Sequence, residues 1–497
     1  MILEKLSGFF WGAPTLVLIL GTGLAITVLC RMPQLRLLPA ALRAFGRKLT
    51  GKGEDGSSYR ALCTALAATV GTGNIAGVAG AIAIGGPGAI FWMWLSALLG
   101  MATKFAESAL AVRFREQSPD GTNRGGPMYM IQKGLPKRWR PLAYVYSFFG
   151  LIAAFGVGNA TQVNAVVTAL GEAGAGYGFA MSEKTGLIVG LILAVLVVRM
   201  VSGGAERIGA AAEVLVPVAA GAYVLVCLGA VWLRREALIS ALVSIVRGAF
   251  SPEAVTGGVV GSGFAALRIG VSRGVFTNEA GMGTASMAHG SAEVDHPVEQ
   301  GLMGIMEVFL DTIVICTLTA LVILTSGVEI PYGTDAGAEL TARALSAGFG
   351  PWVSAFLCAC LCLFAFATIL GWGLYAGRCA EFLLGGMNWK AFALCQGIGV
   401  ILGAVLETGI IWTLSDLMNA LMAVPNLIAL FGLLPELRRL TREYMTIKRG
   451  CSAAGGTYEN FHQRKPLPAF SHAKVPPLRG GGREEGQKDL SSEHRSA

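Results

Sequence analysis

Long apolar runs separated by short polar segments fill the chain as far as residue 435. Runs of about 20 apolar residues are long enough to cross a bilayer as helices, and by this measure we count about eleven spans. They lie near residues 11–30, 61–84, 88–112, 142–170, 186–201, 208–232, 255–275, 302–327, 351–384, 390–411 and 415–435. Hydrophobic residues make up 54% of the 497 residues and charged residues 14%. This pattern predicts an all-α polytopic membrane protein.

The second run is apolar enough to span a membrane, yet its middle is rich in glycine. Gly71, Gly73 and Asn74 stand where a plain spanning helix would carry Leu or Val. We therefore expect the helix to unwind there. Because an unwound backbone is tolerated at membrane depth only inside protein or beside a wet cavity, residues 70–74 are predicted to form a binding site.

A second stretch repeats this pattern. Residues 70–76 (VGTGNIA) are echoed by residues 260–266 (VGSGFAA), with a hydroxyl residue between two glycines both times. Paired glycine-interrupted segments in two halves of a chain indicate an inverted-repeat transporter whose site lies where the broken helices meet. A chance match and a pair of small-residue packing faces are the alternatives. Both stretches also match a dinucleotide fingerprint, but neither follows a predicted strand, so no dinucleotide cofactor is expected.

The spans also divide the chain. With the first span set aside as peripheral, about ten remain and fall into two sets of five, each opening with its broken helix. We expect a peripheral N-terminal helix and basic loop in residues 1–60, repeats in 61–234 and 235–440, and a cytoplasmic tail in 441–497. The tail is rich in Gly, Ser, Pro and charged residues, and this composition predicts disorder.

The net charge of +8 is concentrated in the loops and the tail. The loops after the first and third spans are rich in Lys and Arg, whereas the alternate loops hold few, which predicts an N-terminus outside the cell membrane and a C-terminus in the cytoplasm. Arg234, Arg235 and Arg247 break this pattern, and residues 234–253 are expected to form a short amphipathic helix on the membrane surface. No basic stretch is interleaved with aromatic residues, so the expected partner is the lipid bilayer and not nucleic acid.

The unwound segment offers ligands of both signs. The amides of Thr72 and Gly73, at the start of a half-helix, form a site for a carboxylate. Upstream carbonyls at Ala67, Thr69 and Val70 can coordinate a small hard cation, for which sodium is suited. Asn74 can add an oxygen or an amide donor.

Side chains on other spans complete the predicted site. Thr368 is a candidate hydroxyl ligand for the cation, although a threonine within a span often bonds its own helix backbone. Trp372 lies one turn further on and either walls the pocket or packs in the core. Gln162 belongs to a polar cluster within a span, where interhelical bonding and substrate contact are both open. Phe264, Trp372 and Gln162 are expected to limit the pocket size.

Ionisable residues within spans are costly and mark candidate functional positions. We expect Lys104 to pair with Glu107, and Glu307 and Asp311 either to form a proton or cation path or to pair with Arg268 or Arg273. Neither a hydrolase triad, a Cys-His arrangement nor a zinc motif stands out, so the chain is not expected to be an enzyme.

Several long motifs, in order over about residues 10 to 440, resemble those of the alanine or glycine:cation symporter family, also called sodium:alanine symporters. They include VGTGN at 70–74, GGPMYMI at 125–131, GNATQVN at 158–164 and SRGVFTNEAGMGTASMAH at 272–289. The resemblance implies a leucine-transporter-type fold and sodium- or proton-coupled uptake of alanine or glycine. It places the substrate carboxylate at Thr72 and Gly73, and sodium at Ala67, Val70 and Thr368. Relatives often show two adjacent hydroxyl residues where this chain has Ala367 and Thr368, which implies one hydroxyl ligand fewer.

The sequence therefore predicts a small-neutral-amino-acid importer that works by alternating access, with sodium or a proton as the coupling ion. Two other classes remain open. A channel would need a continuous polar path without saturable coupling, and a sensor of the same fold would bind alanine without moving it.

Overall fold

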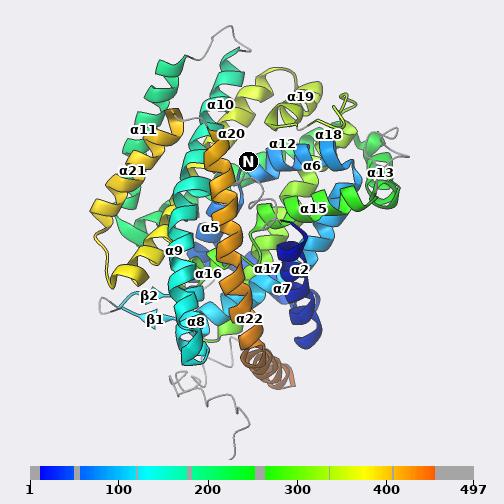
Figure 1. Ribbon diagram of the computed structural model, residues 1–497. Helices are drawn as coiled ribbons and strands as arrows, with labels where there is room; N and C mark the ends of the chain where they lie inside the picture. Colours follow the sequence, from blue (N-terminus) through cyan, green and yellow to red (C-terminus); the bar gives the residue numbers. More distant parts are fainter. Residues whose placement is uncertain are drawn as a thin grey trace, which may run out of the picture.

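The structure is a computed structural model, and it describes residues 12–49, 56–118, 121–175, 182–251, 263–334, 336–405 and 408–453. Helices make up most of this part of the chain (Figure 1). Its one sheet is a short hairpin in which β1 (Glu116–Gln117) pairs antiparallel with β2 (Asn123–Arg124). The architecture is thus all-α, as the apolar runs predict.

Three helices precede the first set of spans, and the first of them packs against α7 (Gly88–Arg113) and α22 (Thr408–Ala453). α2 (Ala13–Leu29), α3 (Pro33–Arg36) and α4 (Leu38–Leu49) come first. The first set then comprises α5 (Gly56–Thr69), η1 (Gly73–Gly77), α6 (Val78–Gly85), α7 (Gly88–Arg113), α8 (Pro127–Gly134), η2 (Lys137–Trp139), α9 (Pro141–Phe155), η3 (Gly156–Ala160), α10 (Thr161–Ala175), α11 (Glu183–Val201) and α12 (Gly204–Leu233). η1 and η3 are π-helical turns inside spans, a feature that often marks functional sites.

The second set begins after two helices on the surface, η4 (Arg235–Ala237) and α13 (Leu238–Phe250). α13 is the helix expected near residues 234–253. The second set comprises α15 (Gly263–Asn278), α16 (Thr284–His289), α17 (Pro297–Val308), η5 (Phe309–Cys316), α18 (Thr317–Thr325), α19 (Ala338–Phe349), α20 (Trp352–Leu384), α21 (Trp389–Val405) and α22 (Thr408–Ala453).

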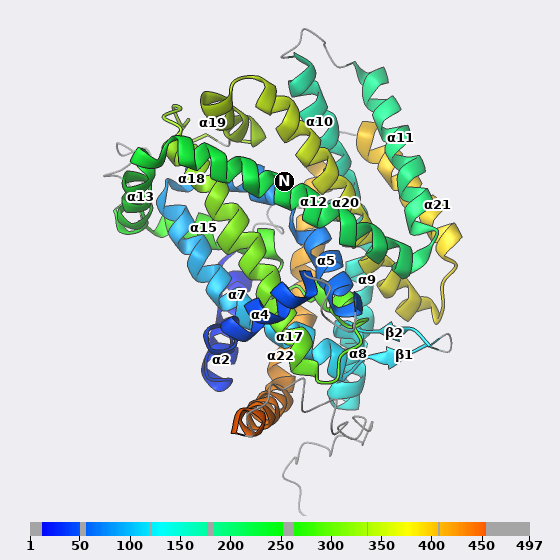
Figure 2. The same cartoon turned by 180° about the vertical axis from the view of Figure 1, so that it is seen from behind.

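Helices of equal rank in the two sets pack against each other. α7 packs along α17, and α11 packs along α21 at one edge of the molecule in both views (Figures 1 and 2). α7 and α17 are the second spans of their sets, and α11 and α21 are the fourth. This pairing is what two related sets of five predict, whereas the exact boundaries at 60, 234 and 440 stay predictions.

The predicted count of about eleven spans is not confirmed. Seven described helical segments are long and apolar enough to cross a membrane, and the bent pair α5 with η1–α6 makes an eighth. α2 and α21 are apolar but have 17 residues each, and α15 has 16. With 16 or 17 residues, these three helices lie at the lower limit of spanning length.

One further prediction lies outside the described residues, and another needs correction. The expected second break at residues 261–263 lies mostly outside the described residues, and α15 then runs unbroken from Gly263 to Asn278. The break that the structure describes lies further on, between α15 and α16. The predicted disordered tail also begins too early, because α22 continues to Ala453, where the buried side chain of Tyr444 and an ion pair between Arg439 and Glu443 support its last turns. Residues 454–497 lie outside the described part.

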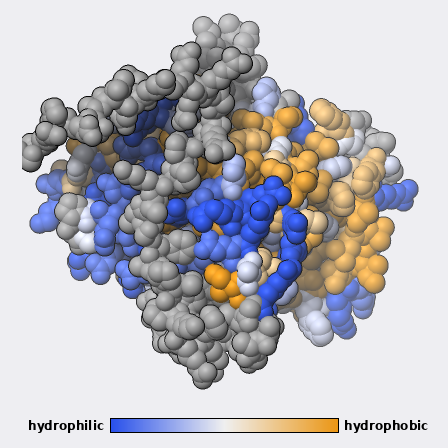
Figure 3. Space-filling view, turned by 90° about the horizontal axis from the view of Figure 1, so that it is seen from below, coloured by the Kyte–Doolittle hydropathy of each residue, from blue (hydrophilic) through white to orange (hydrophobic). Residues whose placement is uncertain are grey.

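Glycines let helices of the core approach closely. A Cβ atom at Gly274 of α15 would collide with the Ser96 side chain of α7, and one at Gly371 of α20 would lie 2.9 Å from the backbone of Ala68. Such small-residue contacts are typical of helices that associate in membranes. On the face where α22 ends, hydrophilic residues cover the middle and hydrophobic residues gather toward one side (Figure 3).

Candidate functional site

The first break lies between α5 and η1. The helical segments Gly56–Thr69 and Gly73–Gly85 meet at an angle of 56°, which confirms the predicted discontinuity. Here the Gly71 amide leaves the helical pattern and donates to Asn74 Oδ1 at 2.8 Å. Asn74 Nδ2 donates in turn to Asp311 Oδ1 of η5 at 2.8 Å. Asn74 therefore holds the break open and ties it to the second repeat.

The second break lies between α15 and α16, in the segment Glu279, Ala280, Gly281, Met282 and Gly283. Glu279, Gly281 and Gly283 have φ values of +52°, +96° and +79°, so the chain turns through left-handed conformations that end any helix. The amides of Gly281 and Gly283 both donate to Glu107 Oε1 of α7, at 3.0 and 3.1 Å. Asn426 Nδ2 of α22 donates to the same oxygen at 2.7 Å.

α20 closes the side of the first break. Thr368 Oγ1 donates to the Ala67 carbonyl oxygen at 3.0 Å, so this hydroxyl faces α5 and not its own helix backbone. In a continuous α-helix the Gly71 amide would donate to the Ala67 carbonyl oxygen. That oxygen has no helical donor here, because the Gly71 amide donates to Asn74 instead. Glycine at position 71 makes the approach possible, since a Cβ atom there would lie 3.2 Å from Thr368 Oγ1.

The two breaks and α20 enclose a cavity of about 30 Å³, room for about two water molecules. Its lining combines the broken segments with side chains of η3, α10, α20 and α22. The residues are Ala68, Thr69, Gly71, Thr72, Gly73, Val157, Gln162, Phe276, Thr277, Glu279, Met282, Thr368, Trp372 and Asn419. The Trp372 ring reaches the cavity past Gly158, where any Cβ atom would collide with it.

Most of the predicted residues meet at this cavity. Thr72, Gly73, Gln162 and Trp372 line it from the substrate set, and Thr69 and Thr368 from the sodium set. Ala67 takes part through its carbonyl oxygen. Val70 is buried directly at the break without lining the cavity.

Two predicted residues lie elsewhere. Asn74 is fully buried and its side chain is directed to Asp311 and Cys316, so it shapes the break and does not line the cavity. Phe264 stands at the start of α15 with 72% of its surface exposed. The prediction that Phe264 limits the pocket is wrong in this structure, because the second break lies about four helical turns further along the chain. Phe276 and Met282 line the cavity instead.

Thr277, Glu279 and Asn419 are the polar lining residues that sequence reasoning missed. The motif NEAGMG at 278–283 contains the signal, because two glycines follow an acidic residue within an apolar region. The echo at residues 260–266 drew the expected break away from it. Asn419 carries no such local signal, since it is a single amide on a long helix.

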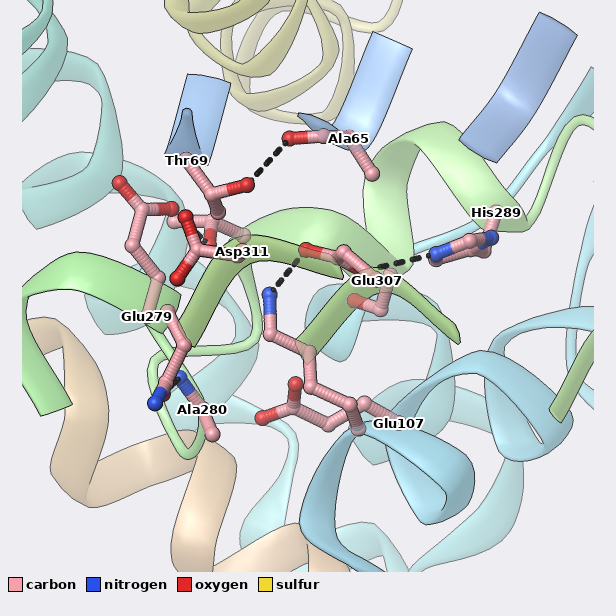
Figure 4. Close-up of polar contacts among 12 residues, drawn as sticks. Ala65, Thr69, Glu107, Glu279, Ala280, His289, Glu307 and Asp311 are labelled. Carbon is pink, nitrogen blue, oxygen red and sulfur yellow. Dashed lines mark hydrogen bonds and ion pairs between the residues drawn. The ribbon is translucent and has the colours of Figure 1, made fainter. Parts of the chain in front are cut away.

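A buried charge cluster lies beside the second break (Figure 4). Lys104 Nζ contacts Glu307 Oε1 at 2.7 Å, and His289 Nε2 lies 3.0 Å from Glu307 Oε2. Lys104 therefore pairs with Glu307 on α17 and not with Glu107, the partner expected from the sequence. Glu107 instead accepts hydrogen bonds from the amides of the second break. Pairing makes these buried charges tolerable at this depth. They join α7, α16 and α17 into one unit.

The donor set around the first break consists of oxygen atoms. In the part of the chain that the structure describes, no three His, Cys, Asp or Glu side chains come together as a metal site. Carbonyl and hydroxyl oxygens at the end of a half-helix suit an alkali cation, while free amides at the start of the next half-helix suit an anion. Chemically, the site can hold a small solute with an anionic end together with a cation.

Comparison with known proteins agrees with this arrangement. Residues 1–454 match the sodium:alanine symporter family. An uncharacterized transporter of Haemophilus influenzae is 43% identical over 450 residues, which cover 89% of this chain and 95% of that protein. The sodium/alanine symporter AgcS of Methanococcus maripaludis is 39% identical over 454 residues, covering 90% and 98%. The crystal structure of MhsT in complex with L-phenylalanine has a TM-score of 0.54 at 15% identity, over 75% of this chain and 87% of that one. This last likeness concerns the fold, which is of the leucine-transporter type.

Proposed function

Because the chain belongs to the sodium:alanine symporter family and is therefore a secondary transporter and not an enzyme, we propose that it imports alanine or glycine together with sodium. The substrate enters from outside and leaves to the cytoplasm by alternating access around the cavity between the two breaks. The N-terminus lies outside and the C-terminus inside, since the basic segments around α4 and α8 belong on the cytoplasmic side.

The observation that carries this proposal is the contact of Thr368 Oγ1 with the Ala67 carbonyl, beside the amides of Thr72 and Gly73. The carbonyl has lost its helical partner, and the hydroxyl approaches it from another repeat. Two oxygens brought together in this way form part of a cation site, to which the carbonyl of Val70 is added. Sodium there links α5 to α20 and so favours the arrangement that holds the amides in place.

Thr72 is the N-cap of η1 and Gly73 is its first residue. Amides at such positions have no partner within the helix. The amides of Thr72 and Gly73 hold the substrate carboxylate, and the dipole of η1 and α6 favours the negative charge. Trp372, Phe276 and Met282 form apolar walls around a small volume. The pocket therefore favours glycine and alanine and rejects longer side chains by steric overlap.

Labelled alanine uptake into proteoliposomes tests the proposal, with imposed sodium or proton gradients and with counterflow. We expect an inward sodium gradient to drive uptake. Gly73→Leu should abolish uptake because its side chain fills the cavity, whereas the matched variant Gly386→Leu, at an exposed position with open space around it, should keep it. Undiminished sodium-dependent uptake by Gly73→Leu would reject the site. Uptake driven by a proton gradient alone would show that the proton, and not sodium, is the coupling ion. Alanine that only equilibrates across the membrane, without coupling to an ion gradient, would indicate a channel.

A further inference from the structure

The cavity lining takes its hydrogen-bond donors and its acceptors from different segments of the chain. The first break presents amide donors from Thr72 and Gly73. Glu279, Gln162 and Asn419 bring acceptor oxygens to the same lining from three other elements. A lining with donors from one segment and acceptors from others selects a solute with two unlike ends.

Two of these acceptors have no partner within the described structure. Gln162 Nε2 donates to the Val157 carbonyl at 3.1 Å, which fixes the orientation of the amide and leaves Oε1 unbonded. Asn419 Oδ1 is also unbonded. The two side chains are 6% and 1% exposed. Since buried polar atoms without a hydrogen bond are costly and rare, these oxygens indicate a donor that the ligand supplies.

Glu279 is the third acceptor and the one acidic residue of the lining. Trp372 Nε1 donates to its Oε1 at 3.2 Å, and Thr284 Oγ1 donates to its Oε2 at 2.6 Å. Neither partner is charged, and neither lysine nor arginine belongs to the lining. Figure 4 shows the Glu279 side chain directed toward Thr69 at the end of α5.

The backbone at Glu279 supports a functional reading. Its φ of +52° is uncommon for a residue with a side chain. Strain of this kind costs about 1–3 kcal/mol and tends to persist at ligand sites. A glycine would relieve it but would remove the carboxylate from the cavity.

We propose that Glu279, together with Gln162 Oε1 and Asn419 Oδ1, forms the subsite for the ammonium group of the transported amino acid. This inference rests on the proposed function and specifies the end of the substrate opposite to its carboxylate. An ammonium group has three N–H donors, which match three acceptors. Its positive charge is compensated by Glu279, without which burial would be strongly unfavourable.

The subsite defines the ligand class. Amino acids with a free primary ammonium group fit this subsite. Hydroxy acids of the same shape lack the positive charge, and N-acylated amino acids lack the charge and are too large for the subsite. L-lactate is the matched probe, because it replaces the ammonium of L-alanine with a hydroxyl and keeps the carboxylate and the methyl group.

Thermal stabilisation of the purified full-length protein in detergent and sodium tests the subsite, with L-alanine and L-lactate as ligands. For Glu279→Gln we expect the alanine concentration that gives half-maximal stabilisation to rise at least about tenfold, because a buried charge loses its partner. The response to lactate should stay the same or increase. The shift produced by sodium alone should also stay, and Glu236→Gln, an exposed acid-to-amide change, should match the wild type in every assay.

Asn419→Ala gives a second reading if Glu279→Gln does not fold, since it removes one neutral acceptor and should weaken alanine binding about threefold to tenfold while leaving lactate unchanged. Equal losses for alanine and lactate would show that Glu279 only holds the break, and unchanged alanine binding in both variants would also overturn the subsite. A wild-type protein that no neutral amino acid stabilises would instead contradict the proposed function itself.

Discussion

The two breaks that form the cavity are built in different ways. At the first break, Gly71 is capped by Asn74 only three residues away, and no described residue from Val70 to Gly77 has a positive φ. At the second break, three residues take positive φ values, and the freed amides bond to Glu107 on α7, far away in the sequence. One break is thus held mainly from within its own segment and the other from outside.

This difference assigns different tasks to the two segments. In the first break no described residue takes a positive φ, and Thr72 keeps helical dihedral angles of −58° and −27°, so the amides that start the half-helix point along its axis, where they serve charged ligands. The second break is a turn with positive φ values, and this strained conformation places Glu279 and Met282 in the cavity lining. Its dependence on Glu107 links the site to α7, which contributes no residue to the cavity lining.

The largest expected effect comes from removing the external support of the second break. Glu107→Ala leaves the amides of Gly281 and Gly283 without an acceptor, at a cost of about 1–3 kcal/mol for each amide. We expect a lower melting temperature in detergent and no alanine uptake. Glu206→Ala, an exposed change on α12, serves as the control. A Glu107→Ala protein with the melting temperature of the control would show that the second break supports itself.

A matched pair of glycine substitutions compares the breaks directly. Gly283→Ala forces a side chain into a φ of +79°, where its Cβ would collide with Pro127 and lie 2.7 Å from Asn426 Oδ1. Such strain costs about 1–3 kcal/mol, so uptake and melting temperature should both fall. Gly73→Ala has an ordinary contact, 3.5 Å from Thr277 Oγ1, and should fold normally. Equal melting temperatures for the two variants would contradict the distinction between a bend and a turn.

The smallest effect is expected at the contact between the first break and α20. In Gly71→Ala the new methyl group lies 3.2 Å from Thr368 Oγ1, so the hydroxyl must shift by a few tenths of an ångström. We expect the sodium concentration for half-maximal uptake to rise about threefold to tenfold, or about 0.6–1.4 kcal/mol. The alanine concentration for half-maximal uptake at saturating sodium should stay near that of Gly386→Ala. An unchanged sodium dependence would remove Thr368 from the cation site.

Sequence reasoning found the first break because its cause is local. Glycines within an apolar run are visible in the sequence, and the adjacent Asn74 supplies the cap. The same reasoning placed Thr368 and Trp372 at the site, since both follow from one helical face of a recognisable span. It missed the role of Asn74, because the attraction of its amide to Asp311 depends on η5, which is remote in the sequence.

The sequence by itself determined that the chain is a helical membrane protein with a broken helix at residues 70–74, because hydrophobicity and glycine content act within a single segment. Only the tertiary structure decided where the second break falls and which acceptors face the first one. Glu107 and Asn419 lie on α7 and α22, and Glu279 lies in the segment between α15 and α16, so these residues meet the breaks and the cavity only after packing brings the separate elements together. The long-range partners of a buried polar group are thus set by the fold, since no local pattern records which distant helix will supply them.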